Sequence, residues 1–160
     1  MCLIINKPQP VAKTATEDIV CYKVVELKMS IVNGAIKHQV LVTPFKHHPV
    51  DYGVLYEDAI QAGFNYGYTP MYMSTVGVYK VEAGGYHLFK NKEDAEELIN
   101  RMPRLPQRSA VIVKAVIPKG TLYIEGLFWW MDDFMPEAVV TKKVIYHPIE
   151  WDETTETKNE

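Results

Sequence analysis

Hydrophobic positions along the chain mostly follow the two-residue alternation of β-strands. Asn33-Gly34 lies between two such segments and is typical of a two-residue hairpin turn. The pattern therefore predicts a sheet of mainly antiparallel strands. Runs rich in β-branched or aromatic residues place these strands at 19–29, 36–42, 76–81, 86–89, 110–117, 121–124 and 139–146.

One segment, at about 92–102, follows the helical period instead. Apolar residues recur there at helical spacing from Ala95 to Met102. Asn91 is well suited to cap the first turn, and Pro103 ends the pattern. A second, weaker helical pattern covers 56–62. The sequence predicts an α+β domain, a sandwich or a barrel-like sheet, with one clear helix.

Length and composition fit one compact domain over residues 1–149. The chain has 160 residues, of which 48% are hydrophobic, enough for one core. Residues 150–160 carry five acidic residues and one lysine, whereas residues 1–149 carry 16 basic and 15 acidic residues. We therefore expect a nearly neutral domain followed by a disordered acidic tail.

Charge and hydropathy exclude several classes of protein. A general nucleic-acid-binding protein would show a basic face, and the sequence pI is about 6.0. No apolar run approaches the length of a transmembrane helix, so no membrane partner is expected. Cys2 and Cys21 provide no disulfide framework, which favours a reducing cytoplasm.

The most suggestive polar residues lie where predicted strands present side chains to a cleft. Tyr86 and His87 follow Gly84-Gly85 and precede the predicted helix, which would brace their strand. Lys23 lies in the more apolar row of its strand, so its side chain would point inward. There it would either extend to the rim of the core or meet an anion.

Two loops add further candidates. A loop between prolines carries Lys46, His47 and Tyr52, and a later one carries Trp129 and Trp130. The aromatic rings would stack on a flat base, and the cations would meet phosphates. Alternatively, the first loop is simply solvated and the tryptophans anchor the core. The candidate ligand-binding residues are Lys23, Lys46, His47, Tyr52, Tyr86, His87, Trp129 and Trp130.

No complete catalytic or metal-binding motif is present. The sequence lacks G-x-S-x-G, a P-loop, G-x-G-x-x-G and C-x-x-C. Neighbouring residues on an extended segment, such as His47 and His48, point to opposite sides. Asp132-Asp133 is followed by no carboxylate at a recognisable spacing. We therefore predict neither a metal nor a cofactor, and no catalytic residue is identified.

Three segments resemble a group of small uncharacterised proteins of bacteriophages and gut bacteria. They are EDIVCYKVV at 17–25, GGYHLFKNKEDA at 84–95 and IPKGTLYIEG at 117–126. The resemblance extends over most of the chain and implies no particular activity. If a bacteriophage encodes the protein, it would act in the host cytoplasm.

The order of predicted elements is also similar to the ADP-ribosyltransferase fold, which binds NAD in a cleft between two sheets. In that resemblance Tyr86 suits the aromatic or hydroxyl position on the second strand. Tyr22 and Lys23 stand where the fold has Arg or His, and residues 141–143 read Thr-Lys-Lys where it has Glu. The resemblance implies a nucleotide-shaped pocket without the complete transferase site.

Three functions therefore stay open. The first is a protein that binds a nucleotide-like small molecule and sequesters a host-defence signal. The second is an ADP-ribosyltransferase-like enzyme that uses NAD, Tyr86 and an unrecognised acid. The third is a non-catalytic protein-interaction domain whose aromatic residues all belong to the core. Each is compatible with a homo-oligomer.

Overall fold

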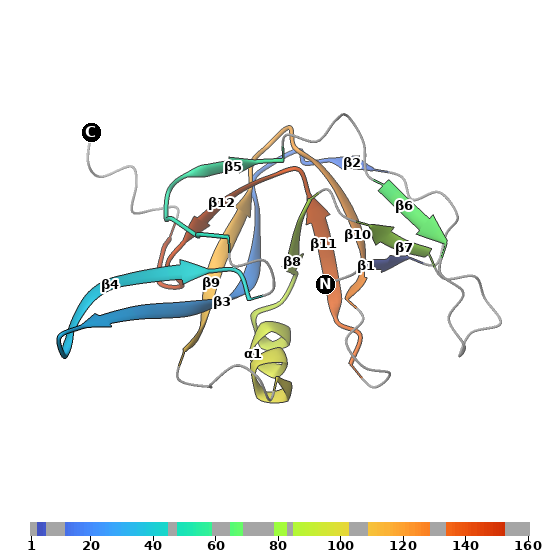
Figure 1. Ribbon diagram of the computed structural model, residues 1–160. Coiled ribbons are helices and arrows are strands. Elements are labelled where there is room, and N and C mark those ends of the chain that lie inside the picture. Colours follow the sequence, from blue (N-terminus) through green and yellow to red (C-terminus); the bar gives the residue numbers. More distant parts are fainter. Residues whose placement is uncertain are drawn as a thin grey trace, which may run out of the picture.

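The computed structural model describes residues 3–5, 12–44, 48–58, 65–68, 79–82, 85–102, 109–128 and 134–152 (Figure 1). These residues form 12 strands in one curled sheet and a single helix. Every pairing between named strands is antiparallel, as the sequence predicts. The α+β class is therefore confirmed.

The strands follow one another along the sheet in the order β5-β12-β9-β3-β8-β11-β10-β1-β7-β6, with β4 pairing to β3 and β2 to β10. Their bounds are β1 Leu3–Ile5, β2 Lys13–Thr14, β3 Ile19–Val32, β4 Ala35–Val42, β5 Leu55–Glu57, β6 Asn65–Tyr68, β7 Tyr79–Glu82, β8 Tyr86–Phe89, β9 Ala110–Ile117, β10 Leu122–Phe128, β11 Glu137–Thr141 and β12 Lys143–His147.

The predicted helix is α1, Lys92–Arg101, which lies below the sheet in Figure 1. Asn91 occupies the N-cap position with an extended backbone, and its side chain donates to Asp94 Oδ2 at 3.1 Å. Ala95 and Leu98 are buried on the face that the helical spacing predicts. The helix thus forms from its local pattern and is held by packing on one face.

The Asn33-Gly34 turn joins β3 and β4, which confirms the predicted hairpin. Both residues have positive φ, 54° for Asn33 and 77° for Gly34, as a type I′ turn requires. Figure 1 shows the far end of this hairpin projecting from the rest of the sheet. We call the projecting residues, 28–32 and 35–40, the arm.

The sheet curls into a half-barrel because β11 runs directly into β12. Between these two consecutive strands, the sheet order inserts β9, β3 and β8. Thr141 is buried at the corner, and its hydroxyl donates to the Lys143 carbonyl oxygen at 3.1 Å. The curl gives the sheet an inner face and an outer face, each with its own core.

Each face carries one cluster of buried side chains. The outer cluster lies under α1 and consists of Val24, Phe89, Ala95, Leu98, Met102, Ile124, Phe128, Phe134, Ala138 and Val140. The inner cluster consists of Ala15, Cys21, Val25, Val50, Leu88, Val113, Ala115, Ile117, Val139, Val144 and Tyr146. Strand alternation explains the division, since Val24 faces α1 while Cys21 and Val25 face inward.

The weak helical pattern at 56–62 is wrong where the structure describes it. Leu55–Glu57 is strand β5, which pairs with Lys143 to Ile145 at the edge of β12. Ladder hydrogen bonds to that edge outweigh the weak helical preference of three residues. Residues 59–62 lie outside the described part of the chain.

The start of the acidic segment at 150–160 lies against β12. Trp151 stacks on His147, with ring centroids 3.9 Å apart, and the Lys114 ammonium donates to the Trp151 carbonyl oxygen. Residues 153–160 are outside the described residues. Among the residues described, the single helix is too short and too polar to cross a bilayer.

Candidate functional site

Lys23 lies buried on the inner face of β3, where only 6% of its surface is exposed. Its position follows from alternation with Cys21 and Val25, as the sequence predicts. The Lys23 ammonium donates a hydrogen bond to the His87 carbonyl oxygen at 2.9 Å. The side chain therefore does not extend to the rim of the core. It forms a hydrogen bond with the neighbouring strand β8 instead.

That hydrogen bond joins β3 and β8 where their backbone pairing is incomplete, a place that we call the seam. Strand β8 pairs with β3 only through Tyr22 and Phe89, and the two strands separate beyond that pair. From Glu26 onward, β4 takes over the same edge of β3, since β9 occupies the other edge. Lys23 therefore supplies a donor to a β8 carbonyl that the β3 ladder does not reach.

The charge on Lys23 is costly in this position. Burial lowers the pKa of its ammonium to about 8. Among the described residues, no carboxylate forms an ion pair with it. The inner face thus holds a cation whose partner in this part of the chain is a neutral carbonyl oxygen.

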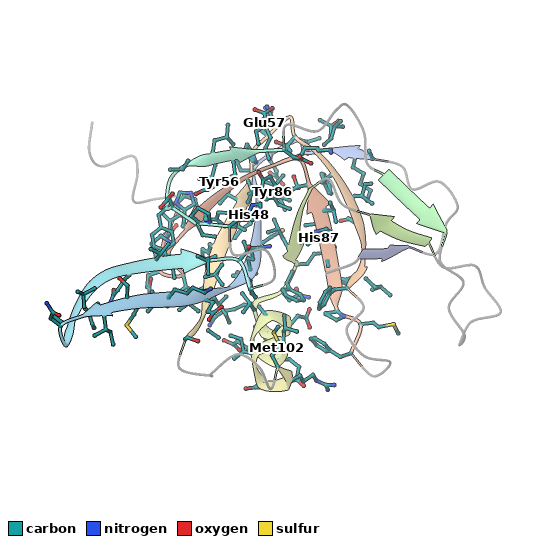
Figure 2. All side chains as sticks on the ribbon, viewed as in Figure 1. His48, Tyr56, Glu57, Tyr86, His87 and Met102 are labelled. Atoms are coloured by element: carbon teal, nitrogen blue, oxygen red, sulfur yellow. The ribbon has the colours of Figure 1, made fainter. Side chains whose placement is uncertain are left out.

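Three tyrosine rings meet beside the seam, at the end where β8 begins. The Tyr56 ring lies 6.5 Å from that of Tyr86, edge to face, and 5.6 Å from that of Tyr146. Figure 2 shows Tyr56 and Tyr86 next to each other below β5. Burial raises the pKa of all three hydroxyls, so they stay neutral hydrogen-bonding groups at physiological pH.

The Tyr146 hydroxyl is buried and has no hydrogen-bond partner among the described residues. A buried unsatisfied hydroxyl costs roughly 1–3 kcal/mol. We therefore expect Tyr146→Phe to raise the free energy of unfolding by about 1 kcal/mol in the absence of ligand. Urea denaturation measures the change, and the exposed Tyr52→Phe serves as its control. A loss of stability would show that the hydroxyl has a partner in solution.

Asp58, a carboxylate near Tyr86, was not among the residues that the sequence suggested. Lys142 Nζ lies 3.2 Å from Asp58 Oδ2, and both side chains are largely buried. Burial contributes most to the raised pKa of Tyr86, and the Asp58 charge adds to it. Asp58 directly follows β5, whose residues resembled a weak helix in sequence. Only the pairing of β5 with β12 reveals that this acid reaches the tyrosines.

A second carboxylate fixes Tyr56. The Tyr56 hydroxyl donates to Asp51 Oδ2 at 3.1 Å and accepts from the Asp51 backbone N–H at 2.9 Å. These bonds tie the segment after β4 to β5. Asp51 thus contacts Tyr56 directly, whereas Asp58 pairs with Lys142 and acts on Tyr86 through its charge.

The structure brings some of the predicted residues together and separates others. Lys23 and Tyr86 share the inner face, whereas His87 points to the outer face because Tyr86 and Leu88 point inward. His87 thus offers its carbonyl oxygen, not its ring, to Lys23. Tyr52 is exposed beside β12. The remaining four candidates, Lys46, His47, Trp129 and Trp130, lie outside the described residues.

Cys21 is a buried free cysteine in the described part of the chain. Burial raises the pKa of the Cys21 thiol to about 12, so the thiol stays protonated at neutral pH. Within the same residues, no three His, Cys, Asp or Glu side chains gather to hold a metal ion, and Asp132-Asp133 lies outside them. No known protein family, curated protein or solved structure is significantly similar to this chain.

Proposed function

We propose that the protein binds a small anionic ligand with a flat ring, such as a nucleotide, at the tyrosine-lined end of the inner face. The observation that carries the proposal is the buried Lys23 ammonium, which no described carboxylate neutralises. A phosphate beside Lys23 would restore a counter-charge and offset part of the cost of burying it.

The neighbouring tyrosines suit the rest of such a ligand. Lys23 contacts the backbone of His87, the residue next to Tyr86. A ring packed on Tyr86 or Tyr56 would therefore place an attached phosphate toward the seam. Asp51, whose carboxylate accepts from the Tyr56 hydroxyl, would offer its remaining acceptor capacity to ribose hydroxyls or to the amino group of a base.

The resemblance to bacteriophage proteins supports one biological use for this binding. A phage protein with such a site would sequester a nucleotide signal that host defence produces, and it would do so in the host cytoplasm. Sequestration needs affinity and no chemical step.

The proposal predicts that Lys23→Met weakens nucleotide binding about tenfold or more, since a charge-assisted hydrogen bond is worth about 1.5–3 kcal/mol. Isothermal titration calorimetry with NAD, ADP-ribose and cyclic mono- and dinucleotides measures the affinity. Lys28→Met, an exposed position on the same strand, is the matched control. Wild-type affinity should also decline as the pH rises above about 8, because Lys23 then loses its proton.

Unchanged affinity in Lys23→Met, or an equal loss in Lys28→Met, would overturn this assignment. The absence of heat with the whole nucleotide panel would overturn the ligand class.

A second candidate function is that of an enzyme with the ADP-ribosyltransferase fold, which would use NAD. The late strand has no glutamate at 141–143, the position of the catalytic acid in that fold. Asp58, whose charge acts on Tyr86, would supply the missing acid and so favours the enzyme. Such an enzyme would break the bond between ribose and nicotinamide and pass ADP-ribose to an acceptor. Labelled NAD in the same experiment distinguishes the candidates, since released nicotinamide or a covalent label would identify the transferase.

A further inference from the structure

The Tyr146 hydroxyl lies on the inner face of the sheet, at its tyrosine-lined end. Tyr146 is only 2% exposed and belongs to the inner cluster. Burial raises the pKa of its hydroxyl, and the nearby hydroxyls of Tyr86 and Tyr56 raise it further. The Tyr146 hydroxyl is therefore a neutral polar group at the end of the inner face where the ligand is proposed to bind.

The groups around this hydroxyl do not supply a hydrogen bond. In the part of the chain that the structure describes, the Tyr146 hydroxyl has no partner. The Tyr56 ring lies 5.6 Å from the Tyr146 ring, but the Tyr56 hydroxyl already donates to Asp51 Oδ2 and accepts from the Asp51 backbone N–H. A buried hydroxyl without a partner is costly, so a ligand that bonds it would gain affinity.

Tyr146 and Lys23 reach the inner face from two strands that are not neighbours. Strand β9 lies between β12 and β3, and Tyr146 pairs with Ala115 on one edge of β9 while Lys23 pairs with Val113 on the other. Two strand spacings separate their backbones by about 10 Å. The two side chains are thus placed to contact different parts of one ligand, with a phosphate at Lys23 and the attached ring toward Tyr146.

Strand β5 covers Tyr146 from the edge of the sheet. Its Tyr56 ring packs against the Tyr146 ring. The strand has three residues and lies at one end of the strand order, where its described partner is β12. Short edge strands open at a lower free-energy cost than central strands. A flat ring would therefore reach the Tyr146 hydroxyl through a local shift of β5, while the central strands stay paired.

We infer that the Tyr146 hydroxyl determines specificity for the ring of the ligand by donating a hydrogen bond to a carbonyl oxygen or an unprotonated ring nitrogen. The inference rests on the proposed function. A tyrosine hydroxyl has one proton to donate. Buried backbone donors without an acceptor are rarer than acceptors without a donor, and the same reasoning favours donation by this hydroxyl. An apolar ring of the same shape would leave the hydroxyl unpaired and would bind more weakly.

The inference predicts opposite effects of Tyr146→Phe on stability and on affinity. The variant keeps the aromatic ring, and without ligand it should be more stable than the wild type because an unpaired hydroxyl is removed. It should bind nucleotides about tenfold or more weakly, since the acceptor on the ligand is then buried without a donor. Urea denaturation of the ligand-free protein measures the stability. Isothermal titration calorimetry with NAD, ADP-ribose and cyclic mono- and dinucleotides measures the affinity.

Tyr22→Phe is the matched control, because Tyr22 packs on the outer cluster of the same sheet. It should bind these nucleotides as tightly as the wild type, and a loss of affinity equal to that of Tyr146→Phe would overturn the inference. If Lys23→Met weakens binding and Tyr146→Phe does not, the inference fails while the proposed function stands. If no nucleotide of the panel binds, the proposed function fails and the inference fails with it. A less stable Tyr146→Phe would show that the hydroxyl is bonded without ligand, which would also overturn the inference.

Discussion

Raising the pH from about 7 to about 10 should stabilise the wild-type protein relative to Lys23→Met by about 2 kcal/mol. In the unfolded chain Lys23 has the ordinary lysine pKa of 10.5, and burial lowers it to about 8 in the folded protein. Between these values the unfolded state holds a proton that the folded state lacks. Stability therefore rises with pH in this window, and the methionine variant lacks that contribution.

Urea denaturation of both proteins at each pH gives the double difference. All other ionisable groups are common to both proteins, so their contributions cancel in the double difference. Lys28→Met should follow the wild type, because Lys28 is exposed. If the difference in the free energy of unfolding between the two proteins does not change with pH, the Lys23 ammonium is solvated in the folded protein. Lys23 would then be no buried cation that a bound anion could neutralise.

Leu98→Ala should lower the free energy of unfolding by about 3 kcal/mol. Leu98 is only 1% exposed and packs in the outer cluster between α1 and the sheet. Truncation removes buried methyl groups and leaves a cavity that strands of the sheet cannot readily close. The helix has ten residues and would be marginal alone in water, so its docking depends on this contact.

Thermal and urea denaturation measure the loss. The control is Glu96→Ala on the exposed side of the same helix, where only the ion pair with Lys92 at 3.0 Å is removed. That change should cost about 0.5 kcal/mol or less. Similar losses in the two variants would show that α1 is not docked through Leu98.

Local patterns predicted many of the elements, but the single strand predicted at 139–146 is two strands, β11 and β12, which are not neighbours in the sheet. Tyr86–Phe89, Ala110–Ile117 and the helix lie within a residue or so of their predicted bounds. The periods of strands and helices differ, and Asn33-Gly34 fixes a turn through its backbone conformation alone. Such signals are contained within a few consecutive residues, so a sequence displays them directly.

The candidate site depended on pairings between distant segments. Alternation predicted that Lys23 points inward, but its contact with the His87 carbonyl arises only because β3 and β8 separate. In the same way, Asp58 comes near Tyr86 only because β5 adds to the edge of β12. Apart from the Asn33-Gly34 hairpin, no local pattern encodes which strands become neighbours, so the seam and the place of Asp58 near Tyr86 could not be predicted.

The topology of β3 also constrains how the chain can fold during synthesis. Two partners of this long strand come from far later in the sequence, since Ile19 pairs with Ile117 and Tyr22 with Phe89. Among its described partners, β4 alone emerges soon after β3 itself. The hairpin is therefore the piece of the sheet that a nascent chain can form early. The rest of the sheet around β3 cannot form until β9 has been synthesised. Such dependence on contacts between distant segments is typical of slow folding.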